Sequence, residues 1–94
     1  MSDNASERRI VFYSGRVQNV GFRYTAQHIA QRFAVTGFVR NLPDGRVHLV
    51  VEGEPKVIAE FLAELASTMS GKIHEAKTTI EPATGEFDSF EITG

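Results

Sequence analysis

The spacing of apolar residues switches between two periods along the chain, and this alternation most limits the folds that the sequence can adopt. Apolar residues at intervals of three and four form one stripe of a helix, whereas short apolar or alternating runs form strands. Strands are therefore predicted at residues 10–13, 35–41, 47–52, 72–81 and 87–92, and helices at residues 22–33 and 54–70.

The two helical stripes are regular. The first comprises Phe22, Ala26, Ile29, Ala30 and Phe33, and the second comprises Ile58, Phe61, Leu62 and Leu65. Each stripe predicts a helix with one apolar face to bury. Pro55 suits the start of the second helix, because an N–H group in the first turn would have no partner within the helix.

A tight turn at residues 42–45 joins the second and third predicted strands. Pro43 presets φ for a turn, and Gly45 accepts a positive φ, so residues 35–52 are predicted to form a hairpin. The element order is then β-α-β-β-α-β, followed by one short strand. This order predicts an α+β, ferredoxin-like sandwich. We expect an antiparallel sheet covered by two helices on one face, with an extra short C-terminal strand.

Length and composition indicate one domain. A chain of 94 residues fits a flexible N-terminal tail at residues 1–8 and a single domain at residues 9–94. With no cysteine, disulfides and cysteine-ligated metals are excluded. A net charge of −2 argues against a general nucleic-acid binder. The polar start and the lack of a long apolar run favour a cytoplasmic protein with no membrane partner.

The segment GRVQNVGFR, residues 15–23, lies between a predicted strand and a predicted helix. The first amides of a helix lack intrahelical partners, and Gly15 and Gly21 allow a loop in which backbone N–H groups converge on an anion. Arg23 in the first helical turn can add a bidentate guanidinium. The segment therefore predicts a phosphate site, although an ordinary loop with a solvated arginine stays open. The GxxxxGK[ST] lysine of a P-loop is missing.

Together with GFVRNLPDGRVHLVVEG, residues 37–53, this segment closely resembles the two signatures of the acylphosphatase family. The closing FDSFEI is similar to the usual last strand of that family, so the resemblance covers nearly the whole chain. It implies a ferredoxin-like fold and hydrolysis of the carboxyl–phosphate bond of acyl phosphates. It also implies a small-molecule acyl phosphate as partner and no metal or other cofactor; a monomer is the simplest expectation.

The resemblance implies roles for individual residues. Arg23 would bind the phosphoryl group, and Asn41, at the end of the second strand, would orient the attacking water. The loop would present backbone amides to phosphate oxygens from Arg16, Val17, Gln18, Asn19, Val20, Gly21 and Phe22. The family usually has glycine where this chain has Asn19. If that position is left-handed, asparagine is the next most tolerant residue, and we expect the loop to survive.

Two other functions stay open at this point. The domain could bind phosphate or carbamoyl phosphate without turnover, as similar domains fused to larger maturation proteins suggest. It could also bind single-stranded RNA on its sheet through Phe12, Tyr13 and Phe38, although neither an RNP1-like pattern nor a basic charge balance supports this.

Overall fold

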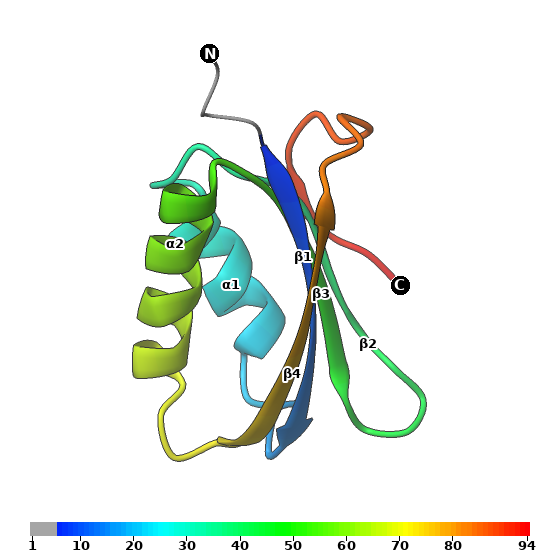
Figure 1. Cartoon of the computed structure of the whole chain (residues 1–94). Coiled ribbons are helices and arrows are strands. Elements are labelled where there is room, and N and C mark those ends of the chain that lie inside the picture. Colours follow the sequence, from blue (N-terminus) through cyan, green and yellow to red (C-terminus); the bar gives the residue numbers. More distant parts are fainter. Residues whose placement is uncertain (1–5) are drawn as a thin grey trace.

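A five-stranded sheet with both helices on one of its faces forms the structure, a computed structural model that describes residues 6–94 (Figure 1). The elements in chain order are β1 (Glu7–Gly15), α1 (Phe22–Ala30), β2 (Thr36–Asn41), β3 (Val47–Gly53), α2 (Pro55–Thr68), β4 (Ile73–Pro82) and β5 (Phe90–Ile92). The predicted ferredoxin-like α+β architecture is confirmed.

The strands lie in the order β4-β1-β3-β2-β5. β1 pairs antiparallel with both β3 and β4, and the β2–β3 hairpin is antiparallel as predicted. The four main strands are thus antiparallel, as expected, whereas the extra C-terminal strand β5 runs parallel to β2, with Gly37 opposite Phe90, so the complete sheet is mixed. The reason lies in the connection: residues 83–89 carry the chain from one edge of the sheet to the other, and the last strand arrives in the direction of β2.

Three element boundaries differ from the sequence-based prediction by three residues, and the others agree within two residues. β1 begins at Glu7, so Glu7 and Arg8 of the expected tail belong to the sheet, where Arg8 pairs with Glu52 and Glu81 on the neighbouring strands. Residues 1–5 of that tail lie outside the described part. α1 ends at Ala30, and residues 31–34 form a turn. β5 covers only Phe90–Ile92, which leaves Phe87 in the connection.

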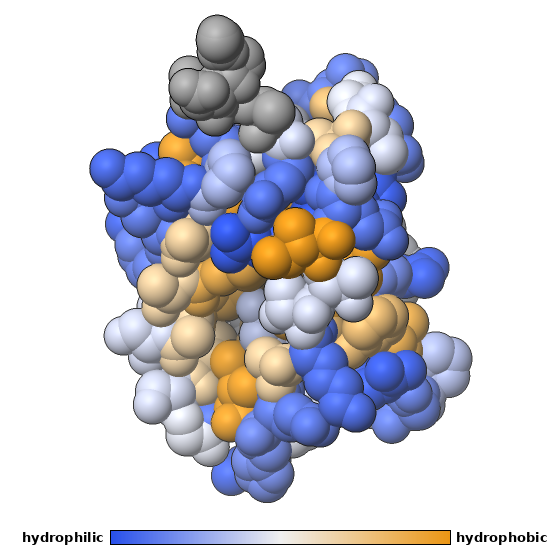
Figure 2. Space-filling model, in the orientation of Figure 1, coloured by the Kyte–Doolittle hydropathy of each residue, from blue (hydrophilic) through white to orange (hydrophobic). Residues whose placement is uncertain are grey.

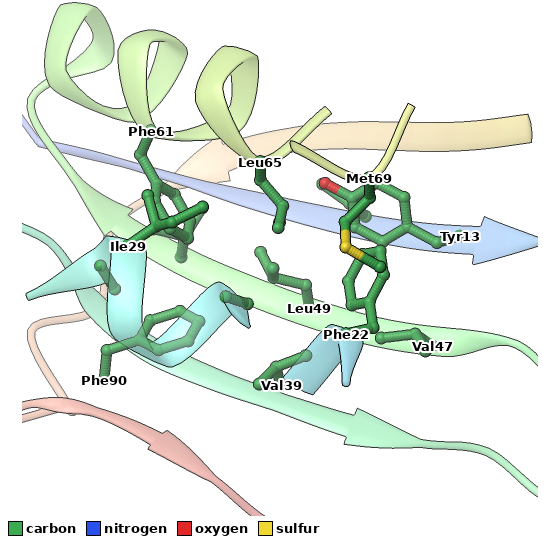
Figure 3. Close-up of a cluster of buried hydrophobic side chains, with 14 of the residues drawn as sticks. Tyr13, Phe22, Ile29, Val39, Val47, Leu49, Phe61, Leu65, Met69 and Phe90 are labelled. Atoms are coloured by element: carbon green, nitrogen blue, oxygen red, sulfur yellow. The ribbon is translucent and has the colours of Figure 1, made fainter. Parts of the chain in front are cut away.

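The core lies between the helices and the covered face of the sheet (Figure 3). Phe22, Ala26, Ile29 and Ala30 of α1 and Ile58, Phe61 and Leu65 of α2 are buried, as their stripes predict. They pack against inward-facing strand residues, among them Val11, Tyr13, Val39, Val47, Leu49 and Val51. Each valine, leucine, isoleucine or phenylalanine among them contributes roughly 1.5–3 kcal/mol when fully buried, so this layer holds both helices to the sheet.

The opposite face of the sheet carries an aromatic and cationic cluster made by Phe12, Phe38, His48 and Arg46. The rings of Phe12 and His48 stack at 4.6 Å, and the Arg46 guanidinium lies 4.7 Å from the centre of the Phe12 ring. Phe38 meets His48 edge-on at 5.3 Å. Tyr13 is 3% exposed and faces the core, so it is not part of this surface. The rings on this face are thus already packed against neighbours in the chain.

β4 forms one edge of the sheet, where the helices do not cover it. All its residues after Ile73 are exposed, and Ile80 is 59% exposed. Figure 2 shows a small hydrophobic patch over the upper part of β4 on a mainly hydrophilic face. Lys77 and two glutamates on this strand discourage pairing with other chains.

Glu52 lies on the open face of the sheet, the face that no helix covers, and binds the connection between β4 and β5. Its carboxylate accepts hydrogen bonds from Arg8 Nε at 2.7 Å, from the amides of Thr84 and Gly85 at 3.0 Å, and from Thr84 Oγ1 at 2.9 Å. Burial acts to raise the pKa of Glu52, but these donors outweigh it and lower the pKa to about 2. The charged carboxylate therefore stabilises the route that leads to β5.

The depressed pKa of Glu52 predicts acid sensitivity. A carboxyl group whose folded pKa lies near 2 and whose ordinary value is 4.5 stabilises the fold above pH 4.5, and this contribution is lost as pH falls through about 2. Glu52→Gln should lower the free energy of unfolding at pH 7 by on the order of 3 kcal/mol and flatten its dependence on pH between those values. Urea denaturation at several pH values measures both effects.

Glu86→Gln is the matched control. Glu86 binds the same Arg8 at 2.9 Å but is exposed, so its loss should cost less than about 1 kcal/mol. Equal effects of the two substitutions would contradict the special weight given to Glu52.

Candidate active site

The candidate site begins where α1 starts. Gly21 immediately precedes the helix with φ of 79°, a left-handed conformation that favours glycine, and no side chain caps the helix end. The first intrahelical bond runs from the Thr25 amide to the Gly21 carbonyl at 2.9 Å. The amides of the three residues in between have no carbonyl partner within the helix, and they carry the partial positive charge of its N-terminus.

Buried contacts hold this helix end in place. Phe22 is 2% exposed, and its ring lies 4.9 Å from the ring of Tyr13 on β1. Val17 in the preceding loop is 1% exposed and belongs to the same core. Arg23 follows Phe22 directly, and among residues 6–94 no ion pair involves its guanidinium. The arginine is therefore available for an anion at the helix end.

Asn41, the last residue of β2, reaches the same place. Gly37 and Val39 on its side of the strand are buried beneath the helices, whereas Arg40 is exposed on the other side, where its Nε donates to His48 Nδ1 at 3.2 Å. The Oδ1 atom of Asn41 is buried and accepts no hydrogen bond within residues 6–94. A buried acceptor without a protein partner points to water or a ligand as its partner.

A cavity of about 190 Å³ unites these groups. Its lining residues are Val17, Asn19, Gly21, Phe22, Arg23, Tyr24 and Asn41. The structure thus brings Arg23 and Asn41, which are far apart in the sequence, to one hollow at the helix N-terminus. The size and the donors suit a phosphoryl group with an attached small substituent.

Three residues of the predicted loop lie outside the cavity lining, each for a physical reason. The amide of Arg16 donates to the Lys72 carbonyl at 2.8 Å, so it joins the loop to the start of β4. Val20 packs against the hydrophobic core. The side chain of Gln18 turns away and donates to the carbonyls of Leu42 and Arg46.

Asn19 has a φ of 62°, so the position is left-handed, the condition on which the sequence argument depended. Among residues 6–94 it is the only residue other than glycine with positive φ. Asparagine tolerates this region better than most residues, and the loop closes around the cavity with it in place.

Tyr24 and the side-chain contact of Gln18 were not predicted from the sequence. Tyr24 lines the cavity and is 69% exposed. Its signal was a large aromatic residue next to Arg23 and off the apolar stripe of α1. The contact made by Gln18 had no sequence signal, because it depends on how the loop meets the hairpin in space.

A larger and more open hollow of about 560 Å³ lies over α1 and the end of α2 and shares Tyr24 with the cavity. Neither Arg23 nor Asn41 lines it. We assign the site to the smaller cavity because its lining, within residues 6–94, includes the start of α1, the Arg23 side chain and Asn41 with its unpartnered buried oxygen.

Comparison with known proteins shows the family of the chain. The acylphosphatase family model matches residues 9–92. The chain belongs to the acylphosphatase family. It is 44% identical to an acylphosphatase of Arthrobacter sp. (strain FB24) over 79 residues, which cover 83% of this chain and 72% of that protein. It also matches the crystal structure of an acylphosphatase from Bacillus subtilis with a TM-score of 0.83 and 30% identity, over 95% of this chain and 99% of that one.

The acylphosphatase fold also occurs inside a much longer protein. Full-length HypF, solved in a phosphate- and nucleotide-bound form, matches with a TM-score of 0.81 and 30% identity. The match covers 95% of this chain but 12% of HypF.

The described residues were also compared with the patterns of metal sites and membrane-spanning helices. Between residues 6 and 94, no group of three or more His, Asp or Glu side chains is arranged to hold a metal ion. Neither helix there has the length and apolar character needed to cross a membrane.

The conformation of Asn19 predicts how this acylphosphatase-family loop responds to substitution. Asn19→Gly should change the free energy of unfolding by less than about 1 kcal/mol, because relief of a left-handed residue is offset by the greater freedom of glycine in the unfolded chain. Asn19→Val should lower it by roughly 1–2 kcal/mol, because a β-branched side chain is disfavoured at positive φ. Urea denaturation of both variants checks this, and equal stabilities would contradict the assigned conformation.

Proposed function

We propose that the protein hydrolyses the carboxyl–phosphate bond of small acyl phosphates and releases a carboxylate and inorganic phosphate. One observation carries the proposal: Arg23, the amides at the start of α1 and the unpartnered Oδ1 of Asn41 meet at one cavity of about 190 Å³. Membership of the acylphosphatase family and the similarity to named acylphosphatases support the same activity.

In this proposal the phosphoryl group is bound by charge and hydrogen bonds. The Arg23 guanidinium donates two parallel hydrogen bonds to phosphoryl oxygens. Backbone amides around Asn19, Gly21 and Phe22 donate to the remaining oxygens, and the helix dipole favours the negative charge. Because these donors are already oriented, they stabilise the charge that spreads over the phosphoryl oxygens in the transition state.

Asn41 positions the nucleophile. Its Oδ1 accepts a hydrogen bond from a water molecule and holds that water in line with the scissile bond. A new bond forms from the water oxygen to phosphorus as the bond from phosphorus to the acyl oxygen breaks. The acyl oxygen leaves as a carboxylate, and the protons of the water pass to the phosphate product and to solvent. A water molecule that is already held in attack geometry loses less entropy on reaching the transition state than a free one, and this lowers the activation free energy.

The chemistry of an acyl phosphate limits the number of catalytic groups that its hydrolysis requires. An acyl phosphate is a mixed anhydride whose leaving group is stable as a carboxylate at neutral pH, so no strong general acid is needed. We therefore propose a metal-independent reaction without a covalent intermediate. We also propose that the protein acts on small molecules as a cytoplasmic monomer.

Hydrolysis of benzoyl phosphate in the presence of a chelator tests the activity. Wild-type protein should remain active, whereas Arg23→Ala and Asn41→Ala should each lower kcat/KM by about 10²–10³-fold, the loss typical of a missing transition-state donor. Arg23→Ala should also weaken binding of inorganic phosphate, measured by calorimetry, because the guanidinium contacts the ground state as well. Asn41→Ala should leave that affinity nearly unchanged.

Arg32→Ala is the matched control. Arg32 lies just after α1, pairs with Glu64 and does not line the cavity. Its substitution should change kcat/KM by less than about twofold, as expected for an exposed pair. Wild-type hydrolysis at the background rate, or full activity in Asn41→Ala, would overturn the proposed mechanism.

One observation favours a second candidate, a phosphate-binding domain without turnover. This chain corresponds to 12% of HypF, where the fold is part of a larger protein. Binding of inorganic phosphate without hydrolysis of benzoyl phosphate would support that candidate instead.

A further inference from the structure

We propose that Gln18 is a positioning residue that holds the loop of residues 16–22 in register with Asn41, an inference that rests on the proposed function. Gln18 Nε2 donates to the Leu42 carbonyl at 2.8 Å and to the Arg46 carbonyl at 3.0 Å. Leu42 follows Asn41 directly, and Arg46 begins the return of the hairpin. One side-chain amide therefore joins the phosphate-binding loop to the turn that carries the water-orienting residue.

This link stands alone within the described part of the chain. Between residues 6 and 94, no other hydrogen bond connects residues 16–22 with residues 41–46. The main-chain hydrogen bonds at the two ends of the loop run elsewhere: the Arg16 amide donates to the Lys72 carbonyl before β4, and the Gly21 carbonyl accepts from the Thr25 amide in α1. Arg23 is placed by the helix and Asn41 by the sheet, but the amides of residues 17–20 are placed by the loop. The position of the phosphoryl group relative to the water therefore also depends on how the loop meets the hairpin.

The turn itself does not need Gln18. The Leu42 carbonyl also accepts from the Gly45 amide at 3.1 Å, and the Arg46 carbonyl also accepts from the Leu42 amide at 2.8 Å. Each carbonyl therefore keeps one partner when the Gln18 donor is removed. A variant at position 18 should fold, which separates positioning from stability.

Gln18→Met tests the inference with nearly the same side-chain length and no donor. On benzoyl phosphate we expect kcat to fall by about 10–100-fold, since a misplacement near 1 Å can cost that much. KM and the affinity for inorganic phosphate should change less than kcat, because Arg23 and the amides at the start of α1 keep their places, and the melting temperature should stay close to wild type. Gln27→Met is the matched control: Gln27 Nε2 donates to the Phe90 carbonyl at 3.5 Å and does not line the cavity, so kcat should be retained.

A second measurement does not need turnover. Backbone order parameters from NMR of the ligand-free protein should be high at residues 17–20 in wild type and in Gln27→Met, and should fall from about 0.85 toward 0.6 in Gln18→Met. Wild-type kcat in Gln18→Met, unchanged order parameters, or a loss of kcat matched by equal losses in phosphate affinity and melting temperature would each overturn the inference. If wild-type protein hydrolyses nothing, the proposed function fails, and the order parameters still decide whether Gln18 holds the loop.

Discussion

The burial of Phe22 at the first position of α1 is the contact on which the rest of the site depends. Its ring is 2% exposed and packs against Tyr13 of β1. A side chain of this kind contributes roughly 1.5–3 kcal/mol when buried, so the helix cannot shift along the sheet without losing much of the stability of a small domain. Because Arg23 and the unpaired first-turn amides adjoin Phe22, one apolar contact places both the charge and the backbone donors.

The two faces of the sheet have separate tasks, and strand alternation divides them. On the covered face, β2 directs Asn41 toward the helix end and into the cavity. On the open face, Glu52 binds Arg8 and the connection at residues 84–85. The Glu52 carboxylate, which stabilises the connection to β5, thus lies on the opposite side of the sheet from the anion site. A carboxylate near Arg23 would compete with a phosphoryl group, whereas one behind the sheet does not.

Most elements were predictable because each depends on a local pattern. The helical stripes, the turn around Pro43 and Gly45, and the loop before α1 all lie where the sequence indicated. Arg23 was predicted from its place in the first turn of a helix as well as from the family resemblance, Asn41 from the resemblance alone, and the structure brings both to one cavity. The parallel pairing of β5 escaped prediction because a three-residue strand carries no signal of its direction. The amide of Arg16 was expected at the site but binds Lys72, a partner 56 positions further on (72 minus 16).

The sequence by itself determined the kinds of groups available: glycines and an asparagine that allow a tight loop, an arginine in a first helical turn, and an asparagine that ends a strand. Those follow from local backbone preferences and from periodicity, which act over a few residues. Only the tertiary structure decided that the arginine and the asparagine share a cavity, that Tyr24 borders it and that Gln18 joins loop to hairpin. Such contacts between distant segments follow from the packing of helix against sheet, and no local pattern encodes their geometry.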